Sequence, residues 1–131
     1  MLARHGLFGL TNTGRSRRIG SFLAKSHRAH SATASFDVSA ASTLVIHNFL
    51  ALPCIEAAPH LPNQEQVIRG ATRGDLCAFA LTEPGAGSSP RHIEASAFLH
   101  EEKVRICGRK LWIGLADWAR WIVLFCASLQ S

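Results

Sequence analysis

Apolar residues recur along the first half of this chain at helical spacing. Over 38–52 they repeat every three or four positions, and the stretch is nearly apolar all round, so it predicts a buried helix that ends near Pro53. Asp37 is well suited to cap the start of this helix. Weaker spacing at 21–30 and a polar-faced stretch at 64–73, closed by a glycine, predict two further helices.

After residue 74 the period changes from helical to strand-like. Three stretches carry the strand pattern: 76–81, 93–106 with a turn near its middle, and 121–127. Helices followed by strands predict an α+β fold, with a helical region joined to the start of a β domain.

The longest uncharged stretch raises the question of a membrane span. It lies between Asp37 and Glu56, covers only 18 residues, and includes a histidine, an asparagine and a proline. A spanning helix needs about 20 predominantly apolar residues. The pattern therefore favours a buried helix and no membrane span.

Charge is distributed unevenly along the chain. The formal charge is +5, and residues 1–36 hold six basic residues and no acid, whereas the rest holds eight basic and nine acidic residues. A basic, acid-free, Ser- and Ala-rich start has the composition of a mitochondrial transit peptide or of a small basic binding module. No nucleic-acid recognition motif accompanies it, so a nucleic-acid partner is not expected.

The cysteines and histidines give no metal motif. The four cysteines are far apart, without a C-x-x-C pair, which favours a reduced intracellular protein. His27 and His30 share a helical spacing, but no third ligand is near, so we interpret them as solvated side chains of a basic helix.

One loop signal is denser than any other. The apolar run that ends at Leu81 is followed by TEPGAGSSP at 82–90, with two glycines, two prolines and two adjacent hydroxyl groups. A strand that delivers such a loop can present backbone N–H groups and hydroxyls to a polar ligand. By residue type alone, an ordinary corner between a strand and a loop is the preferred interpretation.

The motif TEPGAGS at 82–88, followed by GRKLWI at 108–113, resembles the paired signatures of the acyl-CoA dehydrogenase family. The similarity extends back through 42–50 and 64–75, and weakly to 6–10. It implies a partial N-terminal helical domain over 1–75 and the first strands of an incomplete, antiparallel, barrel-like middle β domain over 76–131. The spacing favours a degraded part of the helical domain for 6–36 over a targeting peptide.

The resemblance implies FAD-dependent α,β-desaturation of an acyl-CoA, with an electron-transfer acceptor and a homo-oligomer in the complete enzyme. It assigns FAD contacts to seven residues: Leu81, Thr82, Gly87, Ser88, Trp112, Ile113 and Gly114. Ser88 would also contact the acyl-CoA substrate. The expected compartment is the cytoplasm of a bacterium or, alternatively, the mitochondrial matrix.

Three positions depart from the family pattern. Ser89 stands for the usual Asp, Gly114 for a Thr whose hydroxyl serves the flavin, and Leu115 for an Asn. The family's catalytic glutamate lies in a C-terminal helical domain, so we assign no catalytic base and expect this chain alone to be inactive. The alternative is a non-catalytic interaction fragment or gene remnant of the family.

Other side chains near these motifs have structural interpretations. Glu83 is expected to organise the loop and not to act as a base. Lys110 is expected to be solvated or to support the loop, and not to bind phosphate. Arg91 and His92 are expected at the surface. Trp118 and Trp121 are expected in the core.

Overall fold

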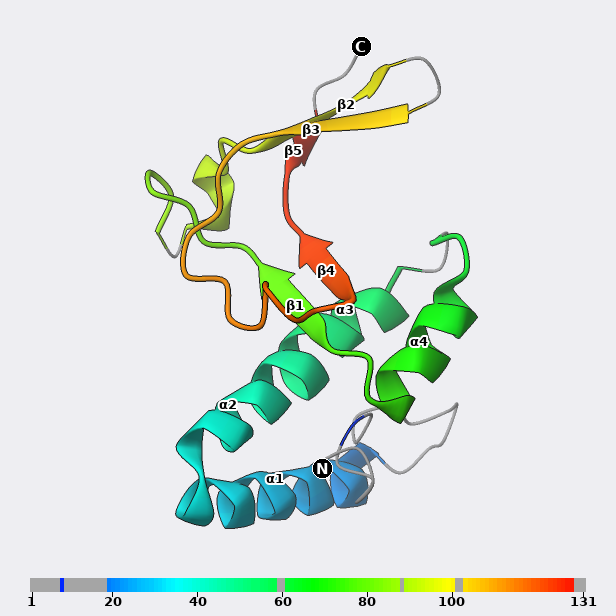
Figure 1. Cartoon of the computed structure of the whole chain (residues 1–131), viewed down its shortest axis with the longest axis vertical. Coiled ribbons are helices and arrows are strands. Elements are labelled where there is room, and N and C mark those ends of the chain that lie inside the picture. Colours follow the sequence, from blue (N-terminus) through cyan, green and yellow to red (C-terminus); the bar gives the residue numbers. More distant parts are fainter. Residues whose placement is uncertain (1–7, 9–18, 59–60, 88, 101–102, 129–131) are drawn as a thin grey trace. The chain divides into compact units, whose positions relative to one another are not determined.

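The computed structural model describes residues 8, 19–58, 61–87, 89–100 and 103–128. Figure 1 shows helices α1 to α4 before the strands along the chain. The helical elements are α1 (Ile19–Phe36), α2 (Val38–Val45), η2 (Ile46–Ala51), α3 (Leu52–Glu56), α4 (Gln64–Arg73) and the short η3 (Pro90–His92). The strands are β1 (Cys77–Ala80), β2 (Ser96–His100), β3 (Lys103–Cys107), β4 (Trp121–Leu124) and β5 (Ala127–Ser128). The predicted α+β class is confirmed.

Two compact units make up the chain. The first contains Met1–Phe79 and Gly114–Val123, and the second contains Ala80–Ile113 and Leu124–Ser131. The division into a helical domain and a β domain at residue 75 stays a prediction.

In the first unit, α2, η2 and α3 form one continuous helix. Asp37 caps it as expected, because its Oδ1 accepts hydrogen bonds from the N–H groups of Ser39 and Ala40 at 2.8 and 3.0 Å. The predicted end near Pro53 is wrong, since the helix continues to Glu56. The turns directly before the proline are π-helical, so their backbone hydrogen bonds join residues five apart instead of four. This change occurs next to Pro53, which has no N–H to donate.

This helix is buried along one face instead of all round. Leu44, His47 and Leu52 are fully buried, whereas Val38 and Val45 are exposed. The helix Val38–Glu56 is long and apolar enough to cross a membrane by length and composition, and a core helix of a soluble protein has the same properties. Within its most apolar 18-residue window, 39% is buried.

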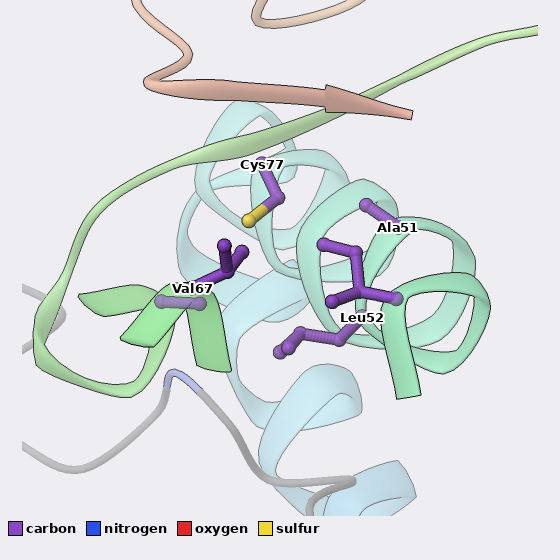
Figure 2. Packing of buried hydrophobic residues seen from close by; sticks show 6 residues of the cluster. Ala51, Leu52, Val67 and Cys77 are labelled. Atoms are coloured by element: carbon purple, nitrogen blue, oxygen red, sulfur yellow. The ribbon is translucent and has the colours of Figure 1, made fainter. Parts of the chain in front are cut away.

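The core of this unit is a small cluster contributed by the long helix, α4 and β1. Its buried members are Ala51, Leu52, Ile55, Val67, Ala71 and Cys77. Figure 2 shows Val67 and Cys77 facing the helix residues Ala51 and Leu52. Val67 and Ala71 lie four residues apart on α4, which is the spacing that places two side chains on the same helix face.

The two ends of α4 are closed in different ways. Gly74 ends it as predicted, with φ of 116°, and its N–H donates to the carbonyls of Gly70 and Ala71. At the start, the Gln64 side-chain amide donates to three carbonyls at the end of the long helix, those of Ile55, Glu56 and Ala58, at 2.7, 3.2 and 3.0 Å. Two of these carbonyls, those of Ile55 and Ala58, also accept backbone N–H groups, from Ala58 and Leu61 at 3.3 and 3.1 Å.

The strands form two small sheets, and the described residues form no closed barrel. β1 and β4 make a two-stranded sheet, and the second sheet has the order β3-β2-β5. β2 pairs antiparallel with β3, as expected for a hairpin, but parallel with β5. The single strand predicted at 121–127 is two strands, because β4 pairs with β1 whereas β5 pairs with β2.

A buried histidine links the long helix to β1. His47 is fully buried, and its Nδ1 accepts the N–H of Cys77 at 3.1 Å. Burial lowers the pKa of His47 from 6.5 to about 4, and an interaction with the Ala71 backbone offsets part of this shift. Burial also raises the pKa of the Cys77 thiol to about 11, so both side chains are neutral near pH 7.

We expect the His47 contact to make the chain less stable in mild acid. The unfolded state takes up a proton near pH 6.5 and the folded state only near pH 4, so the free energy of unfolding falls by up to about 3 kcal/mol as pH drops through this window. Asn in place of His47 keeps an acceptor near the Nδ1 position but does not titrate. Urea titrations between pH 7.5 and 4 should show this fall in the original chain and a smaller one in His47→Asn. Equal slopes in both would contradict the prediction.

Candidate flavin-binding loop cluster

The loop after β1 lies in the second unit and turns through glycines. Gly87 has φ of 49°, and an added Cβ would meet nothing within 4 Å, so glycine there relieves backbone strain and not crowding. Gly85 is crowded instead, since an added Cβ would lie 2.5 Å from Glu94 Oε1. Two turn hydrogen bonds shape the loop, from Gly87 N–H to Glu83 O and from Ser89 N–H to Ala86 O.

Glu83 anchors this loop from inside. Its side chain is buried, and Lys110 Nζ donates to Oε1 at 2.6 Å. The N–H groups of Glu94 and Ala95 donate to Oε2 and Oε1 at 2.6 and 3.0 Å. One carboxylate therefore fixes the loop, the segment before β2 and the second motif to one another.

These contacts also set the protonation of Glu83. The hydrogen bond from Lys110 lowers the pKa of the Glu83 carboxyl and the backbone donors at Glu94 and Ala95 add to this, whereas burial acts in the opposite direction. The carboxylate is thus ionised and fully engaged near neutral pH. This is the arrangement of a structural anchor and not of a free base, as the sequence predicts for Glu83.

The second motif is joined to the first by direct hydrogen bonds. Leu111 N–H donates to Thr82 O at 3.0 Å, and Lys110 Nζ donates to Leu81 O at 3.1 Å. The segments 81–83 and 110–111 therefore lie side by side although 27 residues separate Glu83 from Lys110. Lys110 supports the loop, as expected, and is nearly buried itself.

Several of the expected site residues lie in this loop cluster and have polar groups or aromatic surface that no described residue contacts. The Thr82 hydroxyl is half-buried and makes no hydrogen bond within the described part of the chain. Trp112 follows Leu111 directly, has φ of 54°, and leaves 91% of its surface exposed. Ile113 is half-buried and Gly87 is exposed. An indole that exposed in a folded segment is available for a planar partner.

Two of the expected site residues are not placed with the others. Ser88 lies outside the described residues. Gly114 belongs to the first unit, where an added Cβ would lie 2.6 Å from Ile46 Cδ1. A threonine at this position would therefore require Ile46 to move. Next to it, Leu115 has φ of 70°, a conformation that asparagine tolerates better than leucine.

The structural interpretations of the neighbouring side chains have mixed outcomes. Trp121 packs against the core cluster as predicted, but the core prediction for Trp118 is wrong, because 79% of its surface is exposed. Arg91 and His92 are exposed, as expected.

The histidine pair on α1 differs from its prediction. His30 is buried and its ring contacts Phe49 edge-on at 4.6 Å, so the interpretation as a solvated side chain is wrong for His30. His27 is exposed, with its ring 5.8 Å from that of Phe49. Among the described residues no three histidine, cysteine or acidic side chains gather as metal ligands.

Sequence reasoning did not find the long-range buried contacts within each unit. The hydrogen bond between His47 and Cys77 joins residues 30 positions apart, and the bonds of Glu83 to 94–95 span a whole loop. The only local signals were a histidine within an apolar helix and a glutamate directly before a proline.

Comparisons with known proteins extend the resemblance. Residues 78–131 match the family model described as "Acyl-CoA dehydrogenase, middle domain". A comparison with curated protein sequences gives no match.

Solved structures share the fold over nearly the whole chain. Glutaryl-CoA dehydrogenase from Mycobacterium smegmatis superposes with a TM-score of 0.83 and 22% identity, covering 97% of this chain and 33% of that one. An acyl-CoA dehydrogenase complexed with FAD from Bacillus anthracis gives a TM-score of 0.62 and 24% identity, covering 97% and 22%. The chain thus spans a third or less of these structures. Residues 78–131 therefore match the middle domain of the acyl-CoA dehydrogenase family, and the chain has the fold of a part of these enzymes.

Proposed function

We propose that this chain forms one side of the FAD and acyl-CoA site of an acyl-CoA dehydrogenase, an oxidoreductase acting on a CH–CH bond. The observation that carries the proposal is the hydrogen bond from Leu111 N–H to Thr82 O, because it brings both family motifs together in one loop cluster. The acyl-CoA substrate, the electron acceptor and an oligomeric complete enzyme are part of this proposal. A compartment in the bacterial cytoplasm or the mitochondrial matrix follows from the same family resemblance.

The residues present suit a flavin. Trp112 offers an exposed aromatic face, the Thr82 hydroxyl has no protein partner in the described residues, and the space beside Gly87 is open. Thr82 would hold the polar edge of the isoalloxazine, Trp112 would pack on its ring, and Leu81, Ile113 and Gly114 would contribute through the backbone. Ser88 would contact both the cofactor and the thioester substrate. A bound FAD would supply the hydride-accepting chemistry.

Within the described loop cluster, the buried carboxylate is not free to abstract a proton. The buried carboxylate there, Glu83, is bound by Lys110 and two backbone N–H groups. We therefore propose that the 131 residues alone do not desaturate an acyl-CoA. Incubating the chain with FAD, an acyl-CoA and an artificial electron acceptor tests this, and turnover above a flavin-only blank would contradict it.

The proposal predicts weaker flavin binding when the Thr82 hydroxyl is removed. Thr82→Val should raise the dissociation constant for FAD about fivefold to tenfold, since one hydrogen bond is lost. Quenching of flavin fluorescence on titration with the full chain measures this. Thr43→Val is the matched control, because its hydroxyl bonds to the Ser39 carbonyl of its own helix. No saturable quenching by the unmodified chain, or equal affinity of Thr82→Val, would refute the proposal.

The second candidate is a non-catalytic interaction role. One observation favours it: all five residues of β3 are exposed, including Val104 at 65% and Ile106 at 52%, on the outer strand of its sheet. Such an edge can pair with a strand of another subunit. The partner we propose is an intact subunit of the same family. Co-purification of a complete dehydrogenase with the tagged chain would support this role, and a monomer that captures none would exclude it.

A further inference from the structure

A cavity in the first unit shares no residue with the flavin loop cluster, which comprises residues 81–87 and 110–113 of the second unit. It has a volume of about 490 Å³ and lies between the polar face of α4 and the start of β4. Its lining residues are Asn63, Glu65, Gln66, Arg69, Gly70, Arg73, Asp75, Arg120 and Trp121. This volume is within the range of sites that hold small molecules.

Two of its three arginines are held in place by ion pairs. Arg69 bonds to Glu65 one helical turn away on α4. Arg120 Nε lies 3.4 Å from Asp75 Oδ2, and its guanidinium stacks over the Trp121 ring at 5.8 Å. The backbone N–H of Arg120 is also bound, to the Leu76 carbonyl at 2.9 Å. Arg120 thus has partners for both its main chain and its side chain, although 65% of the side chain is exposed.

The third arginine has no such partner. Arg73 makes no ion pair or hydrogen bond through its guanidinium in the described part of the chain. With three arginines and two carboxylates lining the cavity, one positive charge is left uncompensated, and it belongs to Arg73. An unpaired guanidinium presents a planar fork of donors that matches a carboxylate or a phosphate.

A second observation points to the same cavity. Asn63 precedes α4 in the N-cap position, where an asparagine side chain normally bonds to the backbone of the first helical turn. Here Asn63 has φ of 61° and its side chain makes no capping hydrogen bond. Asn63 lines the cavity instead. Gln66 also lines the cavity, and its side-chain amide makes no hydrogen bond to the described residues.

We propose that this cavity binds a small organic anion through its carboxylate or phosphate group. Arg73 supplies the charge, the amides of Asn63 and Gln66 supply neutral donors, and the paired Arg69 and Arg120 form basic walls. The two carboxylates, Glu65 and Asp75, are held by their own arginines and limit the site to ligands with a single anionic end. The site shares no residue with the flavin loop cluster.

Titration of the isotope-labelled full chain by NMR tests this, with inorganic phosphate and acetate as separate probes at constant ionic strength. Saturable shifts of backbone amides within 63–75 and 120–121 are expected, and the probe that saturates at lower concentration identifies the anionic group. Arg73→Gln should weaken binding about tenfold, the loss of one charged hydrogen-bond donor. Flavin binding should not change in this variant, which separates the two proposals.

Arg105→Gln is the matched control, since Arg105 is an exposed arginine on β3 outside the cavity. If Arg73→Gln fails to fold, Arg73→Lys keeps the charge, loses the planar fork and should bind several-fold more weakly. Shifts that do not saturate with either probe, or equal affinity in the Arg73 variants and the original chain, would overturn the proposal.

Discussion

Alanine in place of Gly108 is expected to destabilise the second unit by about 4 kcal/mol. An added Cβ would lie 2.5 Å from Ala95 Cβ and 2.6 Å from Ala95 Cα, and the latter is backbone that cannot rotate away. Gly108 also has φ of 148°, where an L side chain is strained. Roughly 2 kcal/mol is expected from the clash and roughly 2 from the strain. Chemical denaturation of Gly108→Ala measures the sum.

Gly87→Ala separates the two causes. Gly87 also has positive φ, at 49°, but an added Cβ meets nothing within 4 Å. Its replacement should therefore cost only the strain, about 1 kcal/mol. If both variants lose the same stability, the close approach of Gly108 to Ala95 does not exist in solution.

Replacing Lys110 with methionine should release the loop that carries the first motif. Glu83 would stay buried without its counter-charge, and a buried carboxylate without its partner is strongly unfavourable. The N–H groups of Glu94 and Ala95 bond to this carboxylate, so their hydrogen exchange should accelerate by about a hundredfold or more. Lys103→Met on the exposed β3 is the control and should leave both rates unchanged.

The same substitution should change the response to acid. In the original chain the pKa of Glu83 is lowered, so the stability that Glu83 contributes is present above its ordinary pKa and is lost as the pH falls through the lowered value. Without Lys110 the main cause of the lowering is removed, so Glu83 contributes less stability above its ordinary pKa and less stability is lost as the pH falls. An unchanged acid response together with unchanged exchange would show that Lys110 does not hold the loop.

Local chemistry explains what the sequence predicted correctly. The start of the long helix at Asp37 and the end of α4 at Gly74 were predicted correctly, because a capping carboxylate and a glycine act on neighbouring residues. The loop after β1 was likewise recognisable from its glycines and prolines. These features depend on no partner far along the chain.

Features that depend on distant residues were not predictable. The helix continues past Pro53 after π-helical turns at Ile46–Ala51, and no local sequence pattern predicts these turns. Trp118 has a large apolar side chain of the kind found in cores, but it is exposed because nothing in the described chain covers it. Within the site, the family motifs identified the loop, whereas the burial of Glu83 and its pairing with Lys110 required the three-dimensional contact.

The side chain of Gln64 has a consequence for how the first unit opens. A single amide bonds to three carbonyls of the preceding helix end while its own backbone starts α4. Fraying at either of these two ends breaks the same three bonds, so neither end gains freedom independently of the other. The end of the long helix and the start of α4 should therefore open as one cooperative unit, with a common protection against exchange.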